Sequence, residues 1–142
     1  MPYRLKPGIK EDPARRWNLP DRIFFGHGAC HILAGVFLNS PYGREYSATW
    51  IKPKPALKGH HIICTRDEIA FDYHGYSNRH KLVLHHCRTW AADQPDWSYR
   101  LVEVDFDLLD TAELNARGMR GPDQYLHDPI ARAEAFVAGK HR

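Results

Sequence analysis

The sequence predicts an α+β fold with a mainly antiparallel sheet, and two observations lead to this prediction. Short strand-like segments follow one another with only polar turns between them, and helical segments flank these strands instead of alternating with each of them. The length of 142 residues fits one domain. Prolines are spaced through residues 1–20, so we expect an irregular N-terminal arm there and a single α+β domain over residues 21–142.

The first expected elements lie before residue 40. The apolar "RIFF" at 22–25 is interpreted as a brief strand or a buried lead-in. Apolar residues recur at helical spacing between positions 29 and 38, which predicts a mostly buried helix. Gly26 and Gly28 precede this helix and allow the backbone to turn sharply into its start. The apolar residues of the helix are Ile32, Leu33, Val36 and Phe37.

The later elements follow from alternating patterns, turn residues and helix caps. In chain order we expect strands at 44–54, 60–65 and 69–75, a helix from Ser77 to about Thr89, a strand at 98–106, a short helix capped by Thr111 that stops at Gly118, and a terminal helix opened by Asp128 and Pro129. The second helix is expected to direct Leu82, Val83 and Cys87 inward.

The composition excludes several classes of function. The net charge is +3, with 20 Lys and Arg against 17 Asp and Glu spread along the chain, so we expect no nucleic-acid partner. No segment has the roughly 20 apolar residues that span a bilayer, and the first residues do not resemble a signal peptide. We therefore expect no membrane association and a cytoplasmic protein. An odd number of cysteines, three, favours reduced thiols over disulfides.

The predicted hairpin at 60–75 makes a geometric statement about two polar residues. If its turn is centred between Arg66 and Asp67, His61 lies directly opposite Asp72 on the same face of the sheet. An imidazole–carboxylate hydrogen bond is then expected. A three-residue loop would change the register and place His60 opposite His74 instead.

Cys30 lies at the expected start of the first buried helix. The positive end of a helix dipole stabilises a thiolate, and a nearby histidine would stabilise it further as an imidazolium. An acid beside that histidine would orient its ring and favour its charged form. Cys30 at a helix start, His61 on a strand and Asp72 on the next strand therefore form a candidate catalytic triad.

This order and layout resemble the papain-like, transglutaminase-like superfamily of cysteine enzymes. The matching segments are "GHGACHILAG" around Cys30, "GHHIICT" around His61 and "AFDYHGY" around Asp72. The resemblance covers residues 26 to 76 and identifies no subfamily. It implies a papain-like core and a hydrolase or acyltransferase that acts on an amide or thioester carbonyl of a peptide, protein or small molecule, without a cofactor.

In that reading Cys30 is the nucleophile, His61 is the general base and then acid, and Asp72 orients the ring. The backbone N–H of Cys30 is expected to bind the oxyanion, since no glutamine or asparagine stands closely upstream of it. The residues expected to line the substrate-binding site are His27, Gly28, His31, Tyr73 and His74.

Two alternatives remain open from the sequence. The chain is a non-catalytic binding module if Cys30, like Cys64 and Cys87, is a core residue. It is a metal-binding protein if His27, Cys30 and His31, spaced H-x-x-C-H, are half of a site. Structural zinc needs four ligands, and no C-x-x-C or H-E-x-x-H motif supplies the rest, so we expect no metal in the site.

Overall fold

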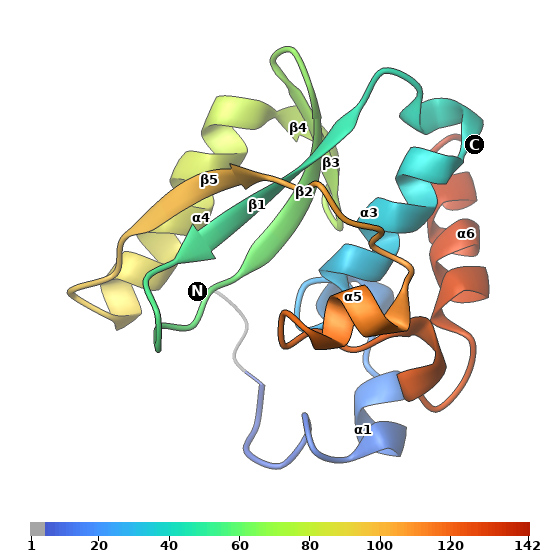
Figure 1. Ribbon diagram of the computed structural model, residues 1–142, viewed down its shortest axis with the longest axis horizontal. Helices are drawn as coiled ribbons and strands as arrows, with labels where there is room; N and C mark the ends of the chain where they lie inside the picture. The colour runs from blue at the N-terminus through green and yellow to red at the C-terminus, as the bar shows by residue number, and fades with distance from the viewer. Residues whose placement is uncertain (1–4) are drawn as a thin grey trace.

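The computed structural model describes residues 5–142 and contains a five-stranded antiparallel sheet between helices (Figure 1). The strand order is β4-β3-β2-β1-β5. The strands are β1 (Ser47–Pro53), β2 (His61–Arg66), β3 (Ile69–Asp72), β4 (Gly75–Asn78) and β5 (Tyr99–Glu103), and every neighbouring pair is antiparallel. The chain is thus α+β, as the sequence predicted.

Helices cover both faces of the sheet because strand side chains alternate between the faces. Helix α3 (Cys30–Asn39) packs on one face, and α6 (Pro129–Gly139) packs against α3 (Figure 1). Helix α4 (Arg79–Asp93) packs on the other face and buries Leu82 and Val83 there. The buried positions predicted for α3 are confirmed, since Ile32, Leu33, Val36 and Phe37 all belong to the core.

The N-terminal segment is more ordered than the sequence predicted. Residues 1–4 of the expected arm lie outside the described residues, but α1 (Pro13–Trp17) and α2 (Asp21–Phe24) are helices. "RIFF" is therefore not a strand but the buried lead-in, with Phe24 and Phe25 in the core. The guanidinium of Arg132 on α6 donates hydrogen bonds to the backbone oxygens of Trp17 and Leu19, at 2.5 and 2.6 Å. These contacts fix the arm against α6.

The hairpin of β2 and β3 turns one residue later than predicted. Arg66 pairs with Ile69, so the two-residue turn is Asp67-Glu68, and Asp67 takes the left-handed conformation (φ 51°) that aspartate tolerates. The predicted direct pairing of His61 with Asp72 is therefore wrong by two positions. Because side chains alternate with a period of two, that shift leaves both residues on one face as diagonal neighbours.

Strand β4 was not predicted, and it replaces the end of the expected strand at 69–75. Asp72 ends β3 and its Oδ1 accepts the backbone N–H of His74 at 2.8 Å, which closes the turn into β4. The extra strand also moves the start of α4. Asn78, not Ser77, caps that helix by accepting the N–H of Lys81 at 2.9 Å.

The remaining elements follow the expected order. Helix α5 (Thr111–Asn115) is capped by Asp110 rather than Thr111, and Asp128 caps α6 with Pro129 in its first turn, as predicted. Two short 3-10 helices, η1 (Pro41–Gly43) and η2 (Pro122–Gln124), complete the chain. Among residues 5–142 no helix is both long and apolar enough to cross a bilayer.

Candidate active site

Cys30 is the first residue of α3, where the chain enters the helix through a glycine. Gly28 has φ +109°, a conformation that disfavours side chains, and Ala29 precedes the helix without a capping side chain. The first intrahelical bond runs from the Leu33 N–H to the Ala29 oxygen. The backbone N–H groups before Leu33 therefore point out of the helix start, beside the half-buried thiol.

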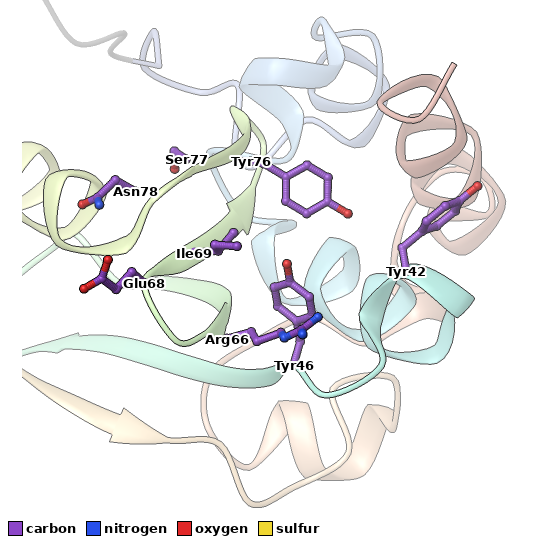
Figure 2. A pocket seen from close by; sticks show the side chains of 8 residues that line it. All are labelled: Tyr42, Tyr46, Arg66, Glu68, Ile69, Tyr76, Ser77 and Asn78. Atoms are coloured by element: carbon purple, nitrogen blue, oxygen red, sulfur yellow. The ribbon is translucent and has the colours of Figure 1, made fainter.

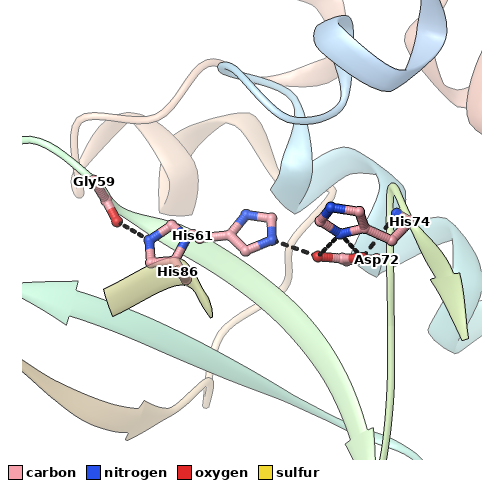
Figure 3. A network of polar contacts seen from close by, with 5 residues as sticks. All are labelled: Gly59, His61, Asp72, His74 and His86. Carbon is pink, nitrogen blue, oxygen red and sulfur yellow. Dashed lines mark hydrogen bonds and ion pairs between the residues drawn. The ribbon is translucent and has the colours of Figure 1, made fainter. Parts of the chain in front are cut away.

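His61 and Asp72 make the hydrogen bond that the sequence predicted. The His61 ring donates Nε2–H to Asp72 Oδ2 at 2.9 Å, and both side chains are almost fully buried (Figure 3). His61 lies at the first position of β2 and Asp72 at the last position of β3, so both point from the same end of the sheet. Since Nε2 serves the carboxylate, Nδ1 is the ring nitrogen left for the thiol.

Asp72 is held by His74 as well as by His61. His74 donates its backbone N–H and its ring Nδ1–H to Asp72 Oδ1, at 2.8 and 3.0 Å (Figure 3). Burial by itself raises the pKa of the Asp72 carboxyl, but the hydrogen bonds and charges of His61 and His74 lower it below its ordinary range. The carboxylate is thus ionised, with its orientation fixed by three donors.

The thiol of Cys30 and the ring of His61 form a charged pair. Burial alone raises the pKa of Cys30, yet hydrogen bonds from the rings of His31 and His61, with their charges, lower it to about 5. Burial alone lowers the pKa of His61, and its bonds with Asp72 and Cys30 raise it to about 10. The pair is therefore thiolate and imidazolium at neutral pH.

His31 is a second imidazole beside the thiol. It is buried, and its Nε2 donates to the backbone oxygen of Arg120 at 2.7 Å, which leaves Nδ1 available on the other side of the ring. Arg120 lies in the loop between α5 and α6, and Tyr125 from the same loop donates its hydroxyl hydrogen to the Gly28 oxygen at 2.7 Å. This loop thus fixes the turn that carries Cys30.

His86 of α4 supports His61 from the other side and was not assigned to the site from the sequence. Its ring stacks on that of His61 at 5.2 Å, and its Nε2 donates to the Gly59 oxygen at 2.6 Å (Figure 3). Burial, followed by the charge on His61, lowers the pKa of His86 to about 3. The sequence held a signal for this position, because Leu82, His86 and Trp90 recur every four residues on one helix face.

The remaining predicted site residues divide between the site and its rim. Tyr73 occupies the turn after β3 with its ring 5.5 Å from that of His61, and burial raises the pKa of its hydroxyl to about 12. Gly28 is exposed at the mouth, and His27 lies half-buried in the turn between α2 and α3. His31 is buried beside the thiol, whereas His74, which bonds to Asp72, is exposed in the turn after β3.

The space beneath the thiol is closed. It is too narrow for a water molecule, and its apolar walls are formed by Phe25, Leu33, Ala34, Ile62, Phe71 and Tyr73. A reacting carbonyl must therefore approach Cys30 from the solvent side, where Gly28 is exposed. The closed space keeps the Cys30 and His61 charges away from bulk water, which strengthens their interaction.

The larger hollow of the molecule lies elsewhere. It has a volume of about 670 Å³ and lies near the turn of the β2–β3 hairpin, where Tyr42, Tyr46, Arg66, Ile69 and Tyr76 surround it (Figure 2). None of Cys30, His61 and Asp72 lines it. Its size therefore gives no information on the chemistry at the thiol.

The metal alternative lacks a ligand set. Within residues 5–142, no three His, Cys, Asp or Glu side chains gather as a metal site requires, so His27, Cys30 and His31 do not form one. All three cysteines are free thiols.

Comparisons with protein-family models, with curated proteins and with solved structures found no match to this chain. The function must therefore be inferred from the geometry of the site.

Proposed function

We propose that this chain is a cysteine hydrolase or acyltransferase that acts on an amide or thioester carbonyl through Cys30, His61 and Asp72. The observation that carries the proposal is the buried His61–Asp72 hydrogen bond of 2.9 Å, on a ring that also holds the Cys30 thiol as a thiolate. A structural cysteine gains nothing from a charged imidazole whose acid partner is fixed by three donors. A nucleophile requires that arrangement.

The residues support a two-step acyl transfer. The Cys30 thiolate forms a C–S bond with the carbonyl carbon, and the carbonyl electron pair moves to oxygen. The tetrahedral intermediate collapses as His61 gives its Nδ1 proton to the leaving amine or thiol, which leaves an acyl-thioester on Cys30. Water or an amine then attacks this thioester while neutral His61 accepts its proton, and the returning electron pair expels the thiolate.

Asp72 remains ionised throughout and keeps the ring in the productive tautomer. Its hydrogen bond to Nε2–H requires that Nδ1 face the thiol. A papain-like core belongs to the same proposal, since a helix-start cysteine packs on an antiparallel sheet whose adjacent strands carry the histidine and the acid. A cytoplasmic location fits it as well, because the nucleophile must stay reduced and the three cysteines are free.

The test is turnover of a panel of activated esters, thioesters and glutaminyl peptides by wild type, Cys30→Ser and Cys87→Ser. We expect Cys30→Ser to abolish turnover without a large change in melting temperature, because serine is a much weaker nucleophile with this base. Cys87 is half-buried on α4, away from the site, so Cys87→Ser is the matched control and should retain turnover.

The binding-module alternative predicts a different result. Wild type would then turn over nothing in the panel, and Cys30→Ser would lower the melting temperature as a substitution of a core residue does. That combination would reject the enzyme.

A further inference from the structure

His60 immediately precedes β2, and its side chain points to the face of the sheet opposite to that of His61. The two residues are adjacent, so their side chains point to opposite faces of the sheet, and the face of His60 is the one that α3 covers. Cys30 starts α3 on that face, and the His60 ring interacts electrostatically with its thiolate. Unlike His61, His60 is exposed to solvent, the medium from which a carbonyl must reach Cys30.

Trp50 fixes which nitrogen of His60 carries the hydrogen. The indole Nε1–H of Trp50 on β1 donates to His60 Nδ1 at 3.2 Å (donor to acceptor), and an indole nitrogen can only donate. Nδ1 must therefore be the unprotonated nitrogen, and the hydrogen of the neutral ring is on Nε2. Burial lowers the pKa of His60, and Lys52 and Lys10 lower it further against the opposing charge of Cys30. The ring is thus a neutral donor at neutral pH.

Four other histidines near the site have a ring N–H group engaged. His61 and His74 donate to Asp72, His31 donates to the Arg120 oxygen, and His86 donates to the Gly59 oxygen. Within residues 5–142, the hydrogen bond found for the His60 ring is the one that Nδ1 accepts from Trp50, and none is found at Nε2. An exposed N–H with its tautomer fixed, at the open side of a nucleophile, is suited to an oxygen of the substrate.

We propose that His60, through Nε2–H, is the side-chain donor that stabilises the oxyanion formed when Cys30 attacks a carbonyl. The second donor is the backbone N–H of Cys30 at the start of α3. This inference rests on the proposed acyl-transfer function and extends it. No proton leaves His60. Its hydrogen bond shortens as the C–S bond forms and the carbonyl electron pair moves to oxygen, and it lengthens again when the intermediate collapses.

Two reactions of the same thiol test the role of His60. Acylation of Cys30 by p-nitrophenyl acetate passes through an oxyanion, whereas alkylation by iodoacetamide displaces iodide and forms none. For His60→Ala we expect acylation to slow by about 10²–10³-fold, the usual cost of losing an oxyanion donor, with alkylation within about twofold of wild type. His80→Ala, an exposed histidine at the start of α4, is the control and should leave both rates unchanged.

Two further variants separate hydrogen-bond donation from packing. His60→Gln keeps an N–H donor on a side chain of similar reach and should restore part of the acylation rate. Trp50→Phe keeps an aromatic ring in the core but removes the indole N–H, so His60 can change tautomer. We expect acylation to slow by a smaller factor, about two- to tenfold, again without an effect on alkylation.

The outcomes are distinguishable. Equal slowing of both reactions in His60→Ala would mean that the residue acts through the thiolate, and unchanged acylation would mean that it plays no part. Either result overturns the role of His60 and leaves Cys30, His61 and Asp72 untouched. Failure of wild type to acylate at Cys30 faster than at Cys87 would instead overturn the proposed function, and the role of His60 with it.

Discussion

Cys30 is the first residue of helix α3 and Cys64 packs against the same helix. Their surroundings shift the pKa values of the two thiols in opposite directions. Cys64 lies in the middle of β2, is fully buried, and its S–H group donates to the Ala34 oxygen at 3.5 Å. Burial raises the pKa of Cys64 far above its ordinary value, and the charge of Asp72 raises it further. Cys30, at the start of α3, has a pKa of about 5.

The comparison shows that burial does not distinguish the two thiols. Burial is the largest influence on each and raises the pKa of both. The difference comes from the neighbouring groups, because the rings of His31 and His61 lower the pKa of Cys30 while Cys64 bonds to a backbone carbonyl. The reactive thiol therefore lies at the start of α3, where polar side chains surround it. The thiol in the middle of the interface between α3 and the sheet contributes only to packing.

The largest expected difference is in alkylation. Near pH 7 the Cys30 thiol is almost entirely thiolate, whereas Cys64 is a protonated thiol without solvent access. We therefore expect iodoacetamide to modify Cys30 at least about 10³-fold faster than Cys64 in the folded protein. Peptide mass spectrometry after timed quenching measures both rates, and a sample unfolded in urea, where the two rates should converge, is the control. Similar alkylation rates for Cys30 and Cys64 in the folded protein would show that Cys30 is not a thiolate at neutral pH.

The sequence predicted the elements around Cys30 well because its signals there are local. Apolar spacing predicted α3, two glycines marked its start, and Asp128 with Pro129 marked the start of α6. The His61–Asp72 contact was also predicted, although the register was wrong by two positions. The contact still forms because a register shift of two positions leaves each side chain on the same face of its strand.

What the sequence did not provide were contacts between distant segments. Strand β4 was missed because Asp72 closes a turn with its own side chain in the middle of an apparently continuous strand. The Trp50–His60 bond spans ten residues and the His31–Arg120 bond spans 89, so no local pattern contains them. His86 was visible on the inward face of its helix, but its partner His61 depends on the packing of α4 on the sheet.

A smaller effect on alkylation is expected from removing His61, the imidazolium that lowers the pKa of Cys30 and is absent beside Cys64. His61→Ala leaves only His31 beside the thiol, so the pKa of Cys30 should rise from about 5 toward its ordinary value of 9.0. Alkylation near pH 6 should slow by about ten- to 100-fold, and the two rates should converge above about pH 9, where both thiols are ionised. The His80→Ala variant is the matched control. Parallel pH profiles for His61→Ala and wild type would show that the helix start alone holds the thiolate.

The smallest effect is on stability, and its sign follows from the two shifted groups of the site. The pKa of Cys30 falls from 9.0 to about 5 on folding, so its contribution is present above about pH 9 and is lost as pH falls through 5. The pKa of His61 rises from 6.5 to about 10, so its contribution is full below about pH 6.5 and is lost as pH rises through 10. Together they predict stability that increases from about pH 5 to 6.5, stays level to about 9, and decreases toward 10.

The Cys30→Ala/His61→Gln double variant removes both groups and isolates this profile. We expect its free energy of unfolding, measured by urea titration at a series of pH values, to increase by about 1 kcal/mol less than that of wild type between about pH 5 and 6.5, because the increase that the low pKa of buried His86 adds is common to both proteins. In the wild-type protein Asp72 contributes no slope in this range, because its carboxyl is ionised in the folded and the unfolded chain above its ordinary pKa of 3.8. Cys64 provides the contrast, since Cys64→Ala should lower the whole curve without changing its shape between about pH 5 and 8, below the ordinary thiol pKa of 9.0. A wild-type curve parallel to that of the double variant would mean that the charged pair at Cys30 does not form.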